Sequence, residues 1–228
     1  MNISVIIPVY NEGEVIAETI ESLRRAGDGQ LSEIIVVDGG SSDHTAAKAR
    51  EAGARVLEAP QKGRACQMNY GAREAGGELL YFLHADSQPP PHFTASIGSA
   101  LDRGHQAGCF RLSFDDDHWL LKLYAWFTRF DIDAVRFGDQ SLFITQKAFG
   151  QIGGFRQDHI VMEDQEIVRR IKQSFSFEVL DRSVTTSARK YRETGIVKLQ
   201  LVFSLIFVLY YMGLEQERLV FIYKRFIQ

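Results

Sequence analysis

One carboxylate, Asp86, closely follows the apolar run "LLYFL", and the chain then turns through three prolines. A hard cation such as Mg²⁺ or Mn²⁺ often binds through only one or two protein carboxylates, with substrate phosphates and water completing its shell. Asp86 alone is therefore sufficient in principle. His84 points to the same side of a strand and is a candidate second ligand or ribose contact. The alternative is that Asp86 only caps the turn into "SQPPP", since Asp often initiates turns.

A second candidate is the stretch "KGRACQMNYGA", residues 62–72. Gly63 permits close backbone approach, and Lys62 and Arg64 come just before an expected helix. This combination suits an anion such as a diphosphate. It is not a Walker loop, because the GK[ST] ending is missing. The alternative is an ordinary basic helix start on a solvated surface.

Two further segments carry acidic residues that could act on an acceptor. Glu163 and Asp164 begin an expected helix, where a carboxylate could serve as general base toward an attacking hydroxyl. Acidic residues are also common in a first helical turn, because the helix dipole favours them. Asp139 and Gln140 precede an expected strand. They could bind acceptor hydroxyls or simply turn the chain through Gly138.

The first 90 residues alternate between strands and helices, which predicts a mostly parallel sheet covered on both faces. Expected strands cover 3–7, 33–38, 54–59 and 78–86, with helices between them. In such sheets ligands bind beyond the carboxyl ends of the strands. The polar residues Tyr10, Asn11, Glu12, Asp38 and Asp86 all follow strand ends. The fold class we expect is α/β, with three layers.

After residue 90, strands and helices alternate less regularly along the chain. Expected helices cover 91–103, 118–130 and 163–172, and expected strands cover 108–114, 141–145 and 177–188.

The chain has 228 residues, of which 45% are hydrophobic and 24% charged, so one large domain is expected. The net charge of −3 gives no reason to expect nucleic acid as a partner. Its two cysteines do not suggest a disulfide framework.

Residues 199–214 form an uncharged run of sixteen residues. A spanning helix usually needs about 20 apolar residues, so a helix in the membrane interface or a dimer contact fits better. A buried core helix is the alternative. We expect residues 1–195 to form one domain and 196–228 a helical appendage rather than an independent domain. No signal peptide is evident at the start, so a cytoplasmic location is expected, with peripheral contact at the inner face of the membrane left open.

The order of the motifs is more specific than any one of them. "SVIIPVYNE" (4–12), "IIVVDGGSSDHT" (34–45), "HADS" (84–87) and "GGF" followed by "MEDQE" (153–166) together resemble family 2 glycosyltransferases of the GT-A fold. The combination of "GRACQMNYGA", "FLHAD", "FGDQSLFI" and "TTSARKYRE" looks closer still to a compact bacterial branch, described as radical-SAM/selenodomain-associated transferase 2. The resemblance spans roughly residues 3–172.

The resemblance implies a nucleotide-diphosphosugar donor, a divalent cation (Mg²⁺ or Mn²⁺) and inversion at the anomeric carbon. It implies that Asp86 holds the metal, with His84 as a tentative second ligand, and that Asp164 is the catalytic base. Residues implied on the acceptor side are Asp139, Gln140 and Glu163. Residues implied at the nucleotide-sugar site are Pro8, Val9, Tyr10, Glu12, Asp38, Arg64 and Ala85.

Two departures from the family pattern matter. Gly39 stands where the family usually has a second acidic residue, and His84 stands where it has the first Asp of Asp-x-Asp. The Gln-x-x-Arg-Trp motif of processive synthases is absent, which favours single transfers.

The sequence does not identify the acceptor, and only the hydrophobic tail suggests a lipid carrier. Alternatives are a non-catalytic nucleotide-binding or membrane-docking protein of this fold, or a nucleotidyltransferase, for which the acidic "PVYNEGE" is a poor match.

Overall fold

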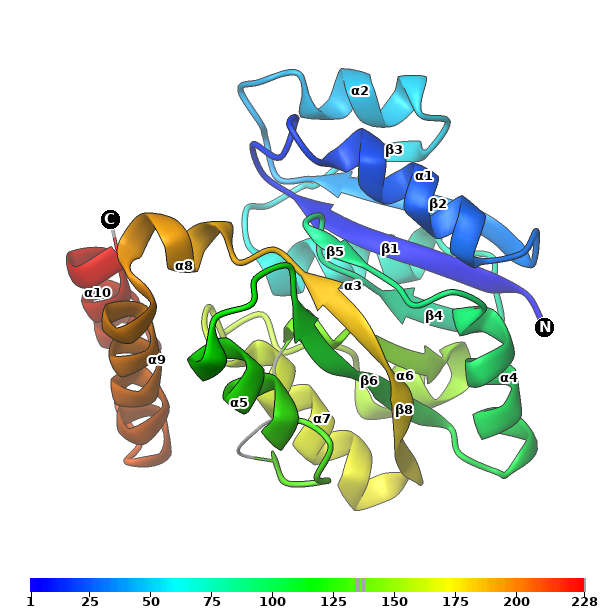
Figure 1. Ribbon diagram of the computed structural model, residues 1–228. Helices are drawn as coiled ribbons and strands as arrows, with labels where there is room; N and C mark the ends of the chain where they lie inside the picture. Colours follow the sequence, from blue (N-terminus) through cyan, green and yellow to red (C-terminus); the bar gives the residue numbers. More distant parts are fainter. Residues whose placement is uncertain (134–135, 137, 228) are drawn as a thin grey trace.

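The structure is a computed structural model that describes residues 1–133, 136 and 138–227. An eight-stranded sheet runs through the centre, in the order β3-β2-β1-β4-β7-β6-β8-β5 (Figure 1). Helices cover both faces, so the expected three-layer α/β class is confirmed. Phe137, the first residue of the motif "FGDQSLFI", lies outside the described residues.

The first half of the sheet is parallel. Its strands are β1 (Ile3–Val9), β2 (Leu31–Asp38), β3 (Arg55–Glu58) and β4 (Leu79–Phe82). β1 pairs with β2 on one side and with β4 on the other, so these three strands end at one edge of the sheet. β1 and the last five residues of β2 are fully buried, as their continuous apolar sequences predict.

The second half of the sheet is mixed. Its strands are β5 (Ser87–Gln88), β6 (Ala107–Phe114), β7 (Leu142–Thr145) and β8 (Phe177–Thr186). β7 runs antiparallel to both β4 and β6, while β8 runs parallel to β6. The short strand β5 pairs with the end of β8, which brings residues that follow Asp86 next to a strand near the C-terminal helices.

Two hydrophobic layers sandwich the sheet because successive side chains of a strand point to opposite faces. Val5 and Ile7 of β1 pack with α1 (Ile16–Ala26) and α4 (Phe93–Asp102). Ile6 packs on the other face with α3 (Arg64–Glu74) and α7 (Glu163–Ser174). Shorter helices α2 (Thr45–Glu51) and α6 (Gln146–Ile152) complete the two outer layers.

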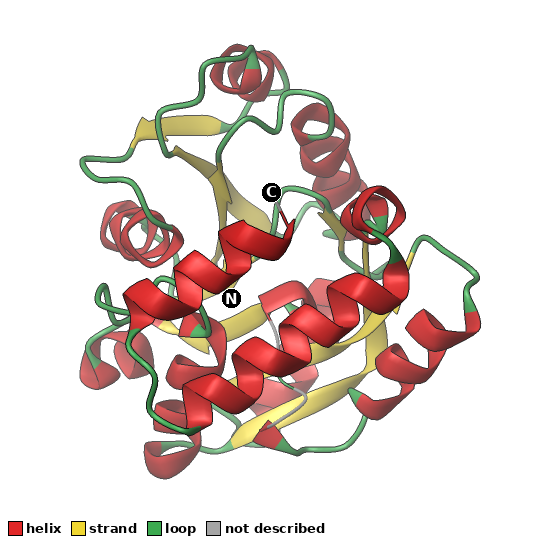
Figure 2. Cartoon of the chain, turned by 90° about the vertical axis from the view of Figure 1, so that its left-hand side faces the viewer, coloured by secondary structure: helices red, strands yellow, loops and turns green. Residues whose placement is uncertain are grey.

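The remaining helices gather on the side of the molecule opposite the N-terminus, where β1 ends (Figure 1). They are α5 (Trp119–Phe127), α8 (Arg189–Thr194), α9 (Ile196–Tyr211) and α10 (Gln216–Ile227). Viewed from that side, two long helices cross the front of the molecule (Figure 2). Among the described residues, no helix is both long and apolar enough to cross a membrane.

Several elements differ from the sequence expectation. The expected strand 78–86 ends at Phe82, and the chain then turns before β5. The apolar run 199–214 does not continue as one helix, because Gly213 adopts a positive φ of 82° and reverses the chain into α10. Helices α6 and α8 had no clear signal in the sequence, since both are short and lack a long apolar period.

Candidate active site

The edge where β1 and β2 end collects several predicted nucleotide-site residues. Val9 pairs with Asp38 in the parallel register, so Tyr10 and Asp38 lie at the same edge. Tyr10 is exposed, and the Lys62 ammonium lies 5.5 Å from the centre of its ring. Pro8 and Val9 are buried strand residues.

Asp38 does not point freely into solvent. Its Oδ1 atom accepts hydrogen bonds from the backbone N–H of Ser41 (3.0 Å) and from the Ser41 hydroxyl (2.5 Å). The residue is buried at the end of β2. These bonds hold the carboxylate and the glycine-containing loop after it in one arrangement.

The loops after β1 and β2 are joined by side chain to backbone hydrogen bonds. The backbone N–H of Ser42 donates to Oδ1 of Asn11 (2.8 Å), which adopts a left-handed conformation with φ 55°. The N–H of Glu12 donates to Thr45 Oγ1 (2.9 Å), and Lys48 Nζ donates to the carbonyl of Gly13 (2.8 Å). The motifs "YNEG" and "SSDHT" therefore form one continuous surface.

Gln67 of α3 stabilises the edge of the sheet where β1 and β2 end, and it was not identified from the sequence. Its amide Nε2 donates to the carbonyls of Val9 and Val37, each at 2.8 Å, and so ties the ends of β1 and β2 together. A β-carbon on Gly39 would lie 3.0 Å from the same amide nitrogen. The absence of a side chain at position 39 thus makes room for Gln67. The available signal was a polar residue on the apolar side of the helix at 64–74.

Asp86 lies in a turn that is fixed by its backbone. The Thr19 hydroxyl donates to the carbonyl of Ala85 (2.5 Å), and the N–H of Ser187 donates to the carbonyl of Asp86 (3.1 Å). Its carboxylate forms no hydrogen bond or ion pair with any other residue in the described part of the chain. Its carboxylate is bonded to its own backbone N–H, and no described residue that follows it in the turn toward Gln88 is capped by it. The carboxylate remains available to a ligand.

Charge around Asp86 is unbalanced toward the negative. Burial, and then the negative charge of Asp139, raise the pKa of the Asp86 carboxyl above its ordinary value. His84 Nδ1 lies 2.9 Å from Asp139 Oδ1. Burial alone would lower the pKa of His84, but the hydrogen bond to Asp139 and the negative charges of Asp139 and Asp164 together raise it. The two carboxylates are thus only partly compensated by His84.

Arg64, Glu163 and Asp164 form the second part of the cluster. Arg64 Nε forms an ion pair with Glu163 Oε1. Glu163 is almost completely buried, and burial raises its pKa although Arg64 opposes the change. Burial would lower the pKa of Arg64, but the charges of Glu163, Asp164 and Asp139 raise it overall. The guanidinium therefore stays charged between acidic residues from η2 (Gly138–Gln140) and α7.

Gly138 closes the space between His84 and Asp164. A β-carbon built on Gly138 would lie 2.1 Å from Asp164 Oδ2 and 2.8 Å from His84 Cε1. Both side chains consequently pack against the Gly138 backbone. The structure thus brings His84, Asp139 and Asp164 together, although the sequence separates them widely.

The residues predicted to lie on the acceptor side are not equivalent in the structure. Asp139 lies in the cluster, and its side chain is 41% exposed. Gln140 is buried, and its Nε2 donates to the carbonyl of Phe110 (3.2 Å). Glu163 is turned toward Arg64. Gln140 and Glu163 therefore have supporting positions, and Asp139 is the one of the three that is open to a ligand.

The donor set fits a cation that binds mainly to its substrate. No group of three or more His, Cys, Asp or Glu residues in the described ranges is arranged to hold a metal by itself. Asp86 offers an uncommitted carboxylate, and the charge of Asp139 adds to the negative potential there. One or two carboxylates plus phosphate oxygens is a normal Mg²⁺ arrangement. His84 has one ring nitrogen engaged by Asp139, so only Nε2 could serve as a ligand.

Two cations on α8 face the acidic residues and were not assigned a role from the sequence. Arg189 donates to Glu12 Oε2 (3.1 Å), and its charge lowers the pKa of Asp86 against the larger effect of burial. Lys190 forms a hydrogen bond with the Tyr223 hydroxyl and opposes the burial effect on Glu12 and Asp139. The signal was the motif "TTSARKYRE", whose basic residues the turn after β8 carries to the site.

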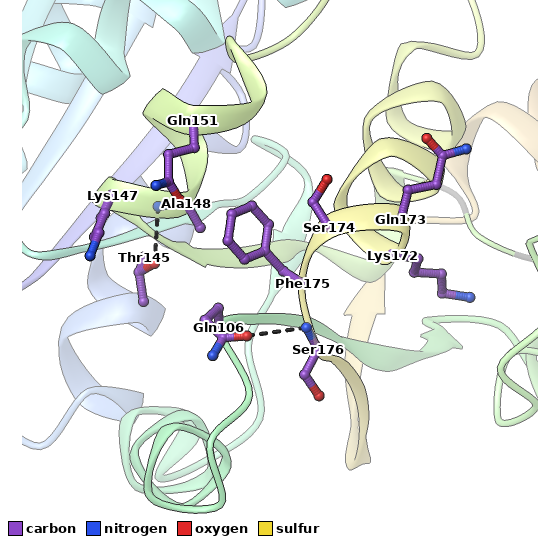
Figure 3. A pocket seen from close by; sticks show the side chains of 10 residues that line it. All are labelled: Gln106, Thr145, Lys147, Ala148, Gln151, Lys172, Gln173, Ser174, Phe175 and Ser176. Carbon is purple, nitrogen blue, oxygen red and sulfur yellow. Dashed lines mark hydrogen bonds between the residues drawn. The ribbon is translucent and has the colours of Figure 1, made fainter.

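A polar cavity lies away from this cluster (Figure 3). It has a volume of about 530 Å³ and is lined by polar residues that include Gln106, Lys147 and Lys172. Gln106 and Ser176 immediately precede the parallel strands β6 and β8, so the cavity lies at the sheet edge opposite Asp86. None of the predicted catalytic residues lines it.

Comparison with known families gives one match that covers most of the chain. The family described as "Glycosyl transferase family 2" matches residues 4–170. Among curated proteins, a dolichol-phosphate mannosyltransferase of Pyrococcus furiosus is 34% identical over 109 residues, which is 46% of this chain and 31% of that protein. An undecaprenyl-phosphate 4-deoxy-4-formamido-L-arabinose transferase of Edwardsiella ictaluri is 36% identical over 112 residues, covering 45% and 34%. The matches thus span about a third of each relative.

Solved structures share the fold at low sequence identity. A mannosyltransferase from Pyrobaculum calidifontis, in complex with GDP-Man and Mn²⁺, has a TM-score of 0.71 and 19% identity, covering 90% of this chain and 61% of that one. Glucosyl-3-phosphoglycerate synthase from Mycobacterium tuberculosis, in complex with Mg²⁺ and UDP, has a TM-score of 0.65 and 18% identity, covering 93% and 80%.

Proposed function

Because the chain belongs to glycosyl transferase family 2, we propose that it transfers a glycosyl group from a nucleotide-diphosphosugar to an acceptor hydroxyl or a lipid phosphate. The proposal includes inversion at the anomeric carbon and dependence on a divalent cation. The observation that carries it is the uncommitted carboxylate of Asp86, held at the sheet edge where the loops after β1 and β2 converge. A capping residue bonds to the residues that follow it in the turn, whereas the Asp86 carboxylate bonds to its own backbone N–H.

The donor would lie along this edge. Tyr10 and Asp38 would contact the nucleoside, with Pro8 and Val9 contributing backbone. Glu12, through Arg189, would hold the loop after β1 and the start of α8 close to the diphosphate. Ala85 would contribute backbone at the turn, although its carbonyl is already engaged by Thr19.

Asp86 would hold a divalent cation, with His84 Nε2 as a second contact. When bound, the cation supplies Lewis-acid neutralisation of the diphosphate leaving group. One solved relative is described in complex with Mn²⁺ and another in complex with Mg²⁺, which supports this choice of metals. Arg189, whose charge acts on Asp86, and Arg64, whose charge acts on His84, would add to the neutralisation of phosphate charge.

Asp164 is the residue we assign as general base. It would accept the proton of an acceptor hydroxyl while that oxygen bonds to the anomeric carbon and the bond to the diphosphate oxygen breaks. Attack opposite the leaving group gives inversion. Asp164 stands in the first turn of α7, and its Oδ2 is held beside the Gly138 backbone. A phosphate acceptor, already ionised, would need less help from this base.

The acceptor and the finer classification are part of the proposal. Two curated relatives are named for polyprenyl phosphates, which supports a lipid phosphate as one acceptor class. The motif combination supports membership of the compact radical-SAM/selenodomain-associated branch. We also propose that residues 1–195 are the catalytic domain and that 196–228 are an appendage. Hydrogen bonds from Ile160 and Val161 to Gln216 support that view, since they tie the appendage to the domain.

The direct test is release of nucleoside diphosphate from UDP- and GDP-sugars with Mn²⁺, with and without undecaprenyl phosphate. We expect release from at least one donor, and loss of it in Asp86→Ala and Asp164→Asn. Asp102→Asn, an exposed residue at the end of α4, is the matched control and should behave as the wild type. Donor binding without release under any condition would favour the non-catalytic alternative. Release of pyrophosphate from a nucleoside triphosphate would favour a nucleotidyltransferase.

A further inference from the structure

Most of the large apolar side chains that are exposed belong to α5 with the residues after it, and to α9 and α10. Five exposed residues on α9 and directly after it recur at helical spacing and form one stripe. They are Val197, Leu201, Leu205, Val208 and Met212, the last being 76% exposed. A soluble protein that stays monomeric rarely exposes a contiguous apolar strip of this length.

Helix α5 carries a second stripe with the same spacing. Trp119 is 68% exposed, and Leu123 and Trp126 are each 44% exposed. The sequence reasoning assigned no surface role to this helix. Tryptophan side chains are enriched at membrane–water interfaces because they combine a large apolar ring with an N–H donor.

The two stripes belong to the same side of the molecule. The inner faces of the two helices meet in one buried cluster, which includes Leu121 of α5, Tyr191 of α8 and Leu199 of α9. The opposite faces therefore point outward around that cluster. Figure 2 shows this side, with the C-terminal helices in front. We call the outer surfaces of α5, α9 and α10 the apolar face.

The charges on the apolar face have one predominant sign. Neither α5 nor α9 contains an acidic residue, and α10 contains one, Glu217, against three basic residues. Lys198, Lys224, Arg225 and Arg129 are exposed and form no ion pair with an acidic residue in the part of the chain that the structure describes. The Arg129 guanidinium instead lies 4.9 Å from the centre of the Trp126 ring. Apolar stripes flanked by unpaired cations are typical of helices that lie in the headgroup region of a bilayer.

We propose that the apolar face docks on the surface of an anionic lipid bilayer, with α5 and α9 both in the interface. A second copy of the chain is a poorer occupant, because a two-fold contact brings together two copies of one face that carries a net positive charge. A lipid surface provides apolar contact and complementary phosphate charge at the same time. The proposal does not depend on catalysis by this protein.

The docked orientation would also place the candidate active site beside the lipid. Val161 and Met162, which precede Glu163, pack against the buried cluster of Val202, Ile206 and Leu219 on α9 and α10. Lys190 links α8 to Tyr223 of α10. This part of the inference rests on the proposed function: a lipid phosphate would reach the acidic cluster from the docked side.

Sedimentation of the full chain with vesicles tests the proposal. We expect binding to vesicles of phosphatidylcholine with phosphatidylglycerol, weaker binding to phosphatidylcholine alone, and weakening by salt. Lys198→Glu combined with Lys224→Glu should reduce the apparent affinity at least about 10-fold. Lys147→Glu combined with Arg73→Glu changes the net charge equally on exposed positions elsewhere and should leave binding unchanged.

A second pair of variants addresses the apolar contact. Leu201→Ser combined with Trp119→Ser should abolish most vesicle binding while circular dichroism and Tm confirm the fold. In the wild type, the fluorescence of its two tryptophans, Trp119 and Trp126, should shift to the blue on adding vesicles. Equal binding by all variants would overturn the proposal, as would stable dimers in light scattering with no vesicle binding. Asp164→Asn should bind vesicles normally, so failure of the proposed catalysis and failure of docking are distinguishable.

Discussion

The backbone of Gly138 touches the carboxylate of Asp164 so closely that a β-carbon there would lie 2.1 Å from Oδ2. A side chain at this position would overlap with the Asp164 carboxylate, so the glycine is required by its neighbour. The position of the proposed base depends on this contact, and the same glycine also limits the space beside His84.

Gly138→Ala should displace Asp164 and leave the fold intact. We expect kcat to fall at least about 10²-fold, since that is the usual contribution of a positioned base. Gly150→Ala is the control, because a β-carbon on Gly150 meets nothing within 4 Å and alanine favours the helix α6. Steady-state kinetics of both variants against wild type provide the measurement. Wild-type kcat in Gly138→Ala would remove Asp164 from the proposed role.

Gln216 should act on the reaction through the loop before α7. Its side-chain carbonyl accepts hydrogen bonds from the N–H groups of Ile160 and Val161, both 3.0 Å. Gln216→Ala should lower kcat about 10-fold or more with little change in donor KM, because small displacements of catalytic groups are costly. Gln216→Glu keeps an accepting oxygen and should restore most of the rate. Gln151→Ala, on the exposed part of α6, should have no effect, and equal losses in all three variants would contradict the positioning role.

Gln67 should contribute to both stability and donor binding. Gln67→Leu removes the donor to the buried carbonyls of Val9 and Val37 and should lower the free energy of unfolding by about 2 kcal/mol. Donor KM should rise because the ends of β1 and β2 lose their link. Urea unfolding and donor titration measure the two effects. Gln30→Leu, at an exposed position between α1 and β2, is the comparison, and an equal change in both variants would refute the assignment.

Asp86→Asn should raise stability near neutral pH. Burial and the charge of Asp139 raise the pKa of Asp86 above the ordinary 3.8, so folding favours the protonated form and the ionised form costs stability. The wild type therefore loses stability as pH rises through the folded pKa. The gain in Tm from Asp86→Asn should be present at pH 7 and disappear as pH falls toward 3.8.

Glu33 provides a control of opposite sign for that experiment. Burial would raise the pKa of Glu33, but bonds from the Gly76 N–H and the Ser4 hydroxyl lower it overall. Its charged form is therefore favoured by folding, and Glu33→Gln should lower Tm at neutral pH, with the loss vanishing in acid. If Asp86→Asn instead lowered Tm at pH 7, Asp86 would be a structural residue.

Strand ends were the most informative part of the sequence. Continuous apolar runs predicted β1 and β2, and the carboxyl-end rule for parallel sheets placed Tyr10, Asp38 and Asp86 at one edge. Those predictions concern backbone direction, which a short buried run largely determines. The contact of His84 with Asp139 was not predictable, because it depends on the antiparallel pairing of β4 and β7 and on the turn before it.

The basic residues of α8 show a different reason for failure. Arg189 reaches Glu12 across an interval of 177 residues, and no local pattern encodes such a pairing. Gln67 was missed because a lone polar residue on a helix looks like a surface position until the strand carbonyls above it are known. The break at Gly213 was hidden by the apolar residues around it, whose composition resembles a single helix.

The pairing of β5 with β8 determines when, during synthesis, the turn that carries Asp86 can form. Ser87 and Thr186, joined by their hydroxyls at 3.0 Å, are 99 positions apart. The turn that presents Asp86 can therefore be completed only after strand β8 has left the ribosome, well after the first four strands. A nascent chain arrested before Phe177 would contain the strands β1 to β7 and still lack β8, which holds the turn after Asp86 in place.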